Sequence, residues 1–259
     1  MIKEITIFPG IDKSGHKETF KYITLKAGET VSIVGPTGSG KTALITDIEL
    51  LAQGDTSTRR RVLINGEIPA DEIRYNPAMK PIVMITQNTK CFADLTTEEF
   101  LQIHARARKI PDMKVVRETI ELANNFTGEK IKSDTKVTVL SGGQTRSLLI
   151  ADAILIGAAP IILLDEIENA GIFKQEVVNL IQNAGKMVVF VTHDPVIALL
   201  TRIRIIMENG GIKKVLHQNE TEIWAAQNLL ELDKKIGNVR EELRAGKTIT
   251  HDFLAVNFA

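Results

Sequence analysis

The stretch "TVSIVGPTGSGKT", Thr30 to Thr42, decides how this chain folds. Its second part, "GPTGSGKT", matches the pattern G-x-x-x-x-G-K-[ST] and lies between an expected strand at 30–35 and an expected helix at 41–53. Glycines let the backbone wrap closely around phosphate oxygens, and the helix that follows directs its positive end toward the anion. A plain glycine-rich turn is the alternative, but the flanking strand and helix favour a nucleotide site.

Two side chains of this loop have expected tasks. Lys41 is expected to reach the β- and γ-phosphates, and Thr42 to supply a hydroxyl to Mg²⁺. The loop does not by itself define the reaction, because small-molecule kinases, GTPases, helicases and transport ATPases all use one. The residues expected to bind the nucleotide here are Gly35, Pro36, Thr37, Gly38, Ser39, Gly40, Lys41 and Thr42.

A second glycine-containing stretch, "VLSGGQTRS" at 139–147, directly precedes an apolar helix pattern. Ser141 and two glycines at a helix N-terminus form another anion site that is rich in donors. Taken alone, the stretch indicates a helix cap with a glycine turn. Because one chain rarely uses two such sites on one triphosphate, two copies arranged head to tail could pair the P-loop of one with this loop of the other.

A third stretch, "LLDEIENAGI" at 163–172, ends an apolar run in adjacent carboxylates. It is either a solvated strand end or the metal-and-water end of the nucleotide site. An acid at the carboxyl end of a buried strand lies where doubly wound sheets bind ligands. With the P-loop upstream, we favour the second interpretation, in which Asp165 and Glu166 serve the reaction.

The composition is that of an ordinary globular protein able to bury a sizeable core, with 44% hydrophobic and 25% charged residues. Acidic and basic residues balance at 32 each, so the bulk charge gives no reason to expect a nucleic-acid partner. Cys91 is the single cysteine, which excludes an internal disulfide and fits a reducing cytosol. The start "MIKEITIF" lacks the core of a signal peptide, and the apolar run at 148–164 is interpreted as a helix, a turn and a buried strand. We therefore expect a soluble, cytoplasmic protein.

Strand and helix patterns alternate at both ends of the chain, whereas 92–136 contains helical patterns only. This predicts a parallel α/β core interrupted by a helical lobe. Thr96 with Glu99 predicts a capping box, and Asp112 can cap the next helix. Strands are expected at 2–8, 30–35, 61–66, 81–86, 160–165, 186–192 and 202–207, with a hairpin after the last, and helices at 41–53, 97–109, 113–126, 145–156, 173–183 and 195–201.

The chain resembles the ATP-binding cassette (ABC) ATPases over about 1–216, because five motifs stand in that family's order: "GPTGSGKT" (Walker A), "MITQN" (Q-loop), "LSGGQ" (signature), "IILLDE" (Walker B) and "VTHD" (switch). The resemblance implies an α/β fold, namely a P-loop NTPase core with a mostly parallel sheet, an antiparallel β subdomain and an inserted α-helical subdomain at about 88–140. The ATPase domain is then expected at 1–220, followed by a C-terminal helical appendage at 221–259.

The resemblance also implies a role for each site residue. Asp165 would hold Mg²⁺ together with Thr42 and Gln87, and Gln87 is placed with the catalytic residues as well. Glu166 would polarise the attacking water, and His193 would contact the γ-phosphate and support Glu166. The protein would thus be a Mg-dependent ATPase that buries two ATP molecules in a homodimer or heterodimer. The residues implied to bind the γ-phosphate of the partner's ATP are Ser141, Gly142, Gly143 and Gln144.

Two regions depart from the family's pattern. Family members usually continue the Walker B acids with proline and threonine and then a loop containing an aspartate, but this chain has Ile172 in the aspartate's place. Coupling between the two sites of a dimer is therefore left open. For the aromatic platform under adenine, Phe8 is the best candidate, and Phe20 and Tyr22 are less well placed.

Two functions from different classes fit these motifs. The favoured one is the ATP-binding subunit of an ABC transporter, held at the inner face of the cell membrane by a separate permease chain. The alternative is a soluble non-transport ABC ATPase that activates or remodels a partner enzyme or its cofactor. A regulatory module without turnover is disfavoured because Glu166 is present. The cargo, the direction of transport and the role of 221–259 do not follow from the sequence.

Overall fold

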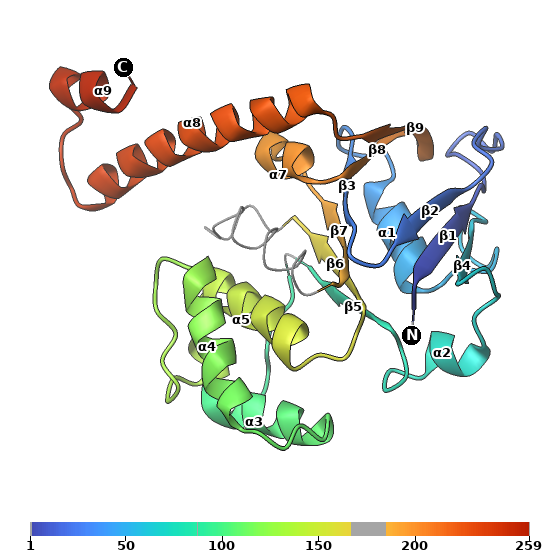
Figure 1. The fold of residues 1–259 in the computed structure, drawn as a ribbon, viewed down its shortest axis with the longest axis horizontal. Helices are drawn as coiled ribbons and strands as arrows, with labels where there is room; N and C mark the ends of the chain where they lie inside the picture. Colours follow the sequence, from blue (N-terminus) through green and yellow to red (C-terminus); the bar gives the residue numbers. More distant parts are fainter. Residues whose placement is uncertain (1, 87, 167–184, 259) are drawn as a thin grey trace. The chain divides into compact units, whose positions relative to one another are not determined.

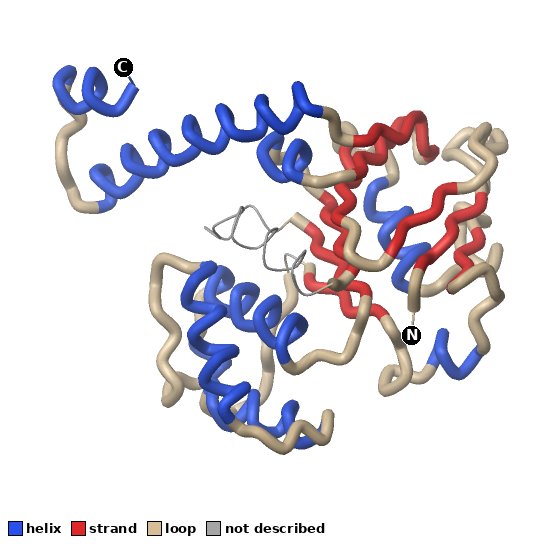
Figure 2. The backbone as a smooth tube through the Cα atoms, viewed as in Figure 1, coloured by secondary structure: helices blue, strands red, loops and turns tan. Residues whose placement is uncertain are grey.

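A mostly parallel sheet carries the strand ends at which the predicted acids stand. The computed structural model describes residues 2–86, 88–166 and 185–258. Within these ranges, a six-stranded sheet has the order β5-β6-β7-β3-β8-β9, with the strands labelled in Figure 1 and coloured red in Figure 2. Its strands run parallel, except that β9 returns antiparallel to β8. The bounds are Thr30–Val34 for β3, Ile82–Ile85 for β5, Ile161–Asp165 for β6, Met187–Val191 for β7, Ile203–Glu208 for β8 and Gly211–His217 for β9.

A smaller antiparallel sheet is formed by two strands that precede the P-loop helix in the chain and one strand that follows it. It has the order β2-β1-β4, with β1 at Glu4–Phe8, β2 at Ile23–Lys26 and β4 at Arg61–Ile64. The sequence patterns missed β2, because only four residues alternate there between buried and more exposed positions. The antiparallel β subdomain implied by the family resemblance is thus confirmed.

Alternate residues of the central strands face two different hydrophobic cores. Leu163 and Val189 belong to the core that includes α1 (Lys41–Glu49) and the antiparallel sheet. Leu164 and Phe190 belong to the core that includes the inserted helices. Since successive side chains of a strand point to opposite faces, a strand covered on both sides reads as a continuous apolar run. This explains why "IILLD" and "MVVFV" show no alternation.

The inserted helices lie between β5 and β6 in the chain, and α4 packs against α5 (Figure 1). The capping box of Thr96 and Glu99 is confirmed. The N-cap of α4 is Met113 and not the expected Asp112, whose carboxylate nevertheless accepts from the Lys114 N–H at 2.9 Å. α5 begins earlier than the expected residue 145, because Ser141 caps it with Gln144. The short α2 was missed, and the helix expected at 173–183 lies outside the described residues. The bounds are Asp71–Tyr75 for α2, Thr97–Ala107 for α3, Lys114–Phe126 for α4, Gly142–Leu155 for α5 and Pro195–Leu200 for α7, with a 3₁₀ turn at Val137–Val139.

The chain divides into two compact units, Met1–His217 and Gln218–Ala259. The second unit contains α8 at Glu220–Arg244 and α9 at His251–Phe258. Trp224 and Leu243 are among the exposed apolar side chains of α8. None of the helices in the described part of the chain has the length and apolar character required to cross a membrane.

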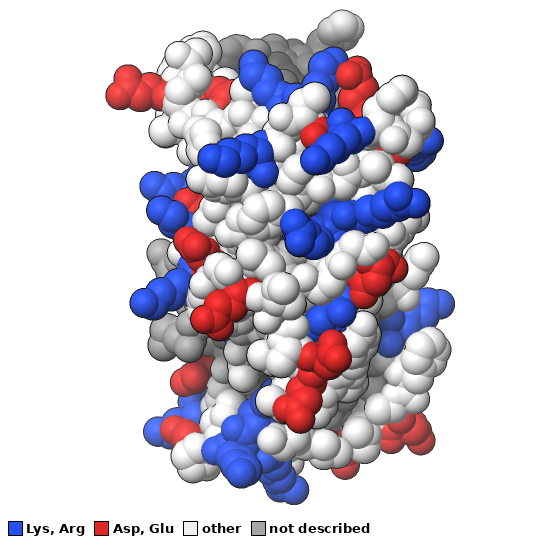
Figure 3. Space-filling model, turned by 90° about the vertical axis from the view of Figure 1, so that its right-hand side faces the viewer, with Lys and Arg blue, Asp and Glu red and all other residues white. Residues whose placement is uncertain are grey.

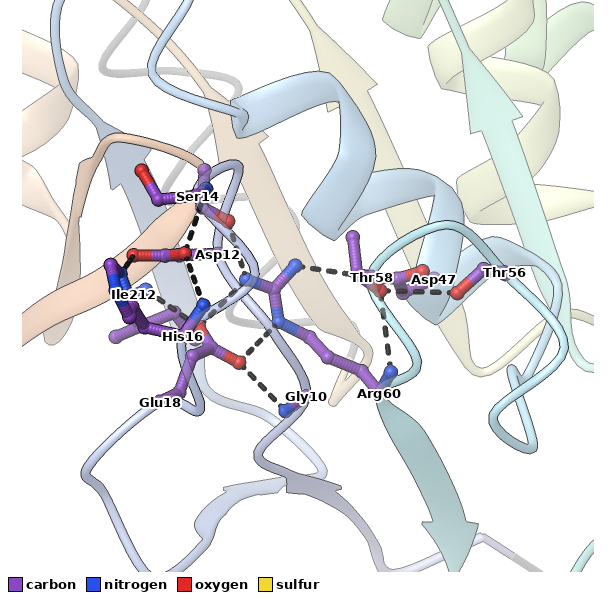
Figure 4. A network of polar contacts seen from close by, with 11 residues as sticks. Gly10, Asp12, Ser14, His16, Glu18, Asp47, Thr56, Thr58, Arg60 and Ile212 are labelled. Atoms are coloured by element: carbon purple, nitrogen blue, oxygen red, sulfur yellow. Dashed lines mark hydrogen bonds and ion pairs between the residues drawn. The ribbon is translucent and has the colours of Figure 1, made fainter.

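Charged side chains are interspersed on the face drawn in Figure 3, with neither sign forming a continuous field. Inside the first unit, however, three charged side chains are buried together (Figure 4). Arg60 is fully buried and bonds to Glu18 at 2.7 and 2.9 Å and to Asp47 at 3.0 Å. Burial alone would lower the pKa of Arg60, but its bonds to the two carboxylates outweigh this and raise it. We call these three residues the buried triad.

We predict that Arg60→Met destabilises the fold by about 3–5 kcal/mol, because it leaves two carboxylates buried without their cation. Urea unfolding of the purified variant measures this loss. The matched control is Arg59→Met, since Arg59 is adjacent in the chain and exposed. The control should stay within about 0.5 kcal/mol of the parent chain. Equal midpoints for the two variants would show that the buried triad does not stabilise the fold.

Candidate nucleotide-binding site

A cleft of about 490 Å³ opens where the P-loop meets the carboxyl ends of β6 and β7. This is the position at which doubly wound sheets bind their ligands. Backbone and side chains of the predicted loop form one wall, and the predicted acids and histidine form another. The cleft is lined by Lys13, Thr37, Gly38, Gly40, Lys41, Thr42, Ala43, Asp165, Glu166, Val191 and His193.

Glycine is required at the end of the P-loop because the loop packs directly on the turn between β8 and β9. Gly40 has a left-handed φ of 96°, and a Cβ added to it would lie 2.7 Å from the Gly210 Cα. Gly210 N–H also donates to the Ser39 carbonyl at 2.8 Å. The β8–β9 turn therefore packs directly on the P-loop, and the contact leaves no room for a side chain at position 40.

Lys41 is buried at the base of the cleft, where its amino group donates to the carbonyls of Gly35 at 2.9 Å and Pro36 at 3.1 Å. Burial lowers the pKa of Lys41, and the charges of Glu166 and Asp165 act in the opposite direction. The Lys41 amino group is thus held by two carbonyls of the P-loop and interacts with the charges of Glu166 and Asp165. Such a cation is suited to neutralise the terminal phosphates of a nucleotide.

The register between β6 and β7 brings the predicted acid and histidine together. Asp165 pairs with Val191 in the sheet, and the Glu166 N–H donates to the Val191 carbonyl at 3.0 Å. Glu166 adopts a left-handed φ of 51°, which is unfavourable for a residue with a side chain. Its carboxylate lies 3.9 Å from His193 Nε2. The geometry therefore places an acid and a histidine together at one end of the cleft.

Lys13 lines the cleft although the sequence analysis gave it no role. The side-chain amino group of Lys13 donates to the Gly38 carbonyl at 2.6 Å, and the backbone N–H of Lys13 donates to the Asn209 carbonyl at 3.0 Å. The Asp12 carboxylate shapes this loop by accepting from the N–H groups of Ser14 and His16 at 2.8 Å each. Lys13 lies 25 positions before Gly38, and no motif in the sequence indicated this contact.

The aromatic candidates for an adenine platform lie outside the lining of the cleft. The Phe8 ring packs against Tyr22, with ring centroids 6.2 Å apart, and the Arg61 guanidinium lies 5.7 Å from the Phe8 centroid. Phe8, Phe20 and Tyr22 are not among the residues that line the cleft in the described part of the chain. The choice of Phe8 stays a prediction.

The signature residues stand on the inserted subdomain and do not line the cleft. Ser141 Oγ accepts from the Gln144 N–H at 3.2 Å, and the Gln144 side chain accepts from the Ser141 N–H at 2.9 Å. Ser141 and Gly142 are exposed. Gln87, predicted to serve catalysis and the metal, lies outside the described residues, as does the unusual loop at 167–172.

The fold and this cleft define a P-loop nucleotide-binding protein, and comparison with known proteins gives its family. The ABC transporter family model matches residues 22–169. An uncharacterised ABC transporter ATP-binding protein of Methanocaldococcus jannaschii is 49% identical over 255 residues, which is 98% of both chains. A thiamine import ATP-binding protein of Brucella suis is 32% identical over 73% of this chain and 78% of its own length. The chain therefore belongs to the ABC transporter family.

Solved structures show the same fold. The structure of cbiO1 from Clostridium perfringens, part of the ABC transporter complex cbiONQ, matches with a TM-score of 0.62 at 20% identity, and the match covers 93% of this chain and 100% of that chain. A dimeric ATP-binding cassette with ADP and Pi matches with a TM-score of 0.56 at 23% identity, covering 83% and 99%. The expected ABC ATPase fold and the ATPase class are confirmed, and the protein is an ATP-binding protein of the transporter type.

We predict that Gly40→Ala distorts the P-loop and abolishes nucleotide binding. The control is Gly66→Ala, because Gly66 also has a positive φ, of 82°, but has open space where a Cβ would lie. Both variants carry about 1–2 kcal/mol of left-handed strain, and only Gly40→Ala adds the clash with Gly210. Thermal unfolding and titration with a fluorescent ATP analogue distinguish them. Full nucleotide affinity in Gly40→Ala would contradict the close packing.

Proposed function

We propose that this chain binds MgATP in its cleft, pairs with a second ATP-binding subunit in a nucleotide-sandwich dimer, and hydrolyses ATP to drive a membrane permease. The observation that carries the proposal is the separation of two anion-binding elements. The cleft brings together Lys41, Asp165, Glu166 and His193, but the exposed signature loop lies apart from it on the same chain. A second copy supplies the missing element.

Each residue of the cleft has a task that its position supports. Lys41 and the N–H groups of the loop hold the β- and γ-phosphates, since phosphoryl transfer depends chiefly on positioning and charge neutralisation. Glu166 orients and polarises the attacking water, and His193, 3.9 Å away, holds the Glu166 carboxylate and contacts the γ-phosphate. Lys13 adds a second cation on the Gly38 side of the loop.

The oxygen groups in the cleft fit Mg²⁺. Thr42 and Asp165 both line it, and a hydroxyl and a carboxylate are ligands that this hard cation prefers. Mg²⁺ usually takes one or two protein carboxylates and completes its shell with phosphates and water. The described residues accordingly contain no cluster of three or more His, Cys, Asp or Glu side chains positioned for a metal. Bound with the nucleotide, Mg²⁺ would neutralise charge on the β- and γ-phosphates.

The signature loop is suited to receive the partner's nucleotide. Ser141 Oγ is the acceptor in its bond with Gln144, so the hydroxyl proton remains available for a phosphate oxygen. Gly142 and Gly143 open α5, and the first N–H groups of a helix have no partner within the helix. These donors suit the γ-phosphate that protrudes from the other subunit's P-loop.

A pocket on the inserted subdomain supports a permease partner. It has a volume of about 180 Å³ between the β5 end, α3 and α5, and Val83, Met84 and Leu149 give it apolar walls. His104 and Asp152, joined by a hydrogen bond of 2.7 Å between His104 Nδ1 and the Asp152 carboxylate, also line it. The relative named as a thiamine import ATP-binding protein also favours a transporter. We propose that a short helix of the permease docks here and holds the chain at the inner face of the membrane.

We predict that Glu166→Gln lowers steady-state ATP hydrolysis at least about 10²-fold, roughly 3 kcal/mol of barrier, and retains ATP binding. Because ATP then persists, the variant should form a stable ATP-dependent dimer, measured by light scattering after size-exclusion chromatography. Glu121→Gln on the α4 surface is the control and should hydrolyse ATP like the parent. Unchanged hydrolysis in Glu166→Gln would exclude the proposed catalytic role.

We predict that Arg108→Glu, at the rim of the pocket, weakens binding to a permease that has several membrane spans. Arg106→Glu is the matched control, because Arg106 is exposed in the same turn but does not line the pocket. Both variants should keep basal ATPase activity. Co-purification from membranes of the source cells, with identification of the bound chain, measures the difference. A soluble enzyme as the specific partner would refute the transporter role.

A further inference from the structure

Arg146 is a buried cation whose side chain the described residues leave largely unsatisfied. It stands on α5, one helical turn after Gly142, and side chains on a helix lean toward its N-terminus. Its Nη2 lies 3.1 Å from the position of a Cβ added to Gly142. Only 8% of the residue is exposed, yet its Nε and Nη1 have no hydrogen-bond partner in the described structure.

This arrangement is energetically unfavourable for the chain by itself. A buried donor without an acceptor costs about 1–3 kcal/mol, and more when it is charged. The guanidinium also lies near the positive end of the α5 dipole, where an anion is favoured and a cation is not. Burial lowers the pKa of Arg146.

The buried triad shows how the same chain treats a buried arginine that serves the fold. Arg60 is fully buried, and its guanidinium meets two carboxylates and the Gly210 carbonyl. Arg146 has no comparable partners among the described residues. The two nitrogens of Arg146 without a partner are enclosed by the chain, whereas Nη2 lies against Gly142. An anion bound at the exposed signature loop would therefore meet the guanidinium at its Nη2 end.

We propose that Arg146 is a binding residue for the terminal phosphate of the ATP held by a second copy of this chain. The proposal rests on the sandwich dimer of the proposed function. Ser141 and the N–H groups of Gly142 and Gly143 meet that phosphate from the exposed side, and Arg146 adds a full positive charge against Gly142. Since ADP lacks the γ-phosphate, this charge makes association of the two copies depend on ATP.

The decisive variant is Arg146→Met in the Glu166→Gln background, because methionine keeps the length of the side chain and removes its charge. Removal of an unsatisfied buried charge should leave the melting temperature equal or higher, whereas loss of a structural arginine would lower it. The ATP-dependent dimer should weaken at least tenfold in its dissociation constant, measured by analytical ultracentrifugation. Binding of a fluorescent ATP analogue to the monomer should be unchanged.

Two further variants complete the test. Arg117→Met is the control, since Arg117 is exposed on α4 and pairs only loosely with Glu121 at 3.6 Å. Arg146→Lys keeps the charge and should recover most of the dimerisation. The Arg146→Met variant could both melt at a lower temperature and dimerise poorly. In that case, dimerisation of the Arg146→Lys variant supports the phosphate role, and its failure to dimerise refutes that role.

The outcomes separate this inference from the proposed function. A Glu166→Gln parent that stays monomeric with MgATP would refute the sandwich dimer itself. A parent that dimerises equally well with and without the Arg146→Met change would refute the role of Arg146 and leave the sandwich dimer standing. Weaker dimerisation that is confined to ATP, with unchanged monomer binding, is the result we expect.

Discussion

The position of the P-loop depends on the buried Arg60 guanidinium. Arg60 donates to the Gly210 carbonyl at 2.8 Å, and Gly210 in turn donates to the Ser39 carbonyl inside the P-loop. Through Asp47 the same arginine is bonded to α1, and through Glu18 to the loop that contains Lys13. Two carboxylates in a dry interior are tolerable only with their cation present. One arginine therefore fixes three segments around the nucleotide cleft.

The two cores explain why catalytic groups can stand at strand ends without loss of packing. Side chains within β6 and β7 are committed in alternation to the α1 side and the helical side. Asp165 and Glu166 come directly after the last fully buried position of β6, where packing no longer determines the residue type. The sheet thus positions the two acids through its backbone register, and both acids line the cleft.

Features that depend on local patterns could be predicted from the sequence. The P-loop, the capping box at Thr96 and the acids at the end of β6 each follow from neighbouring residues, and the structure has them where expected. The contacts of Arg60 could not be predicted, because Arg60 and Gly210 are 150 positions apart and no pattern links them. The contact of Lys13 with Gly38 was missed because the two residues are 25 positions apart and the loop of Lys13 has no regular structure that a sequence pattern could indicate. Arg146 could not be predicted either, because the burial of its Nε and Nη1 without a partner among the described residues is visible only in three dimensions.

The capping box of Ser141 and Gln144 has a consequence for association kinetics. Both reciprocal bonds are already present in the single chain, so the backbone donors of the signature loop are fixed before a partner arrives. Ordering of a flexible loop at an interface lowers affinity and slows productive encounter. Here the loop is preorganised when the chain folds, and a collision between two nucleotide-loaded copies needs only the correct orientation to become a complex.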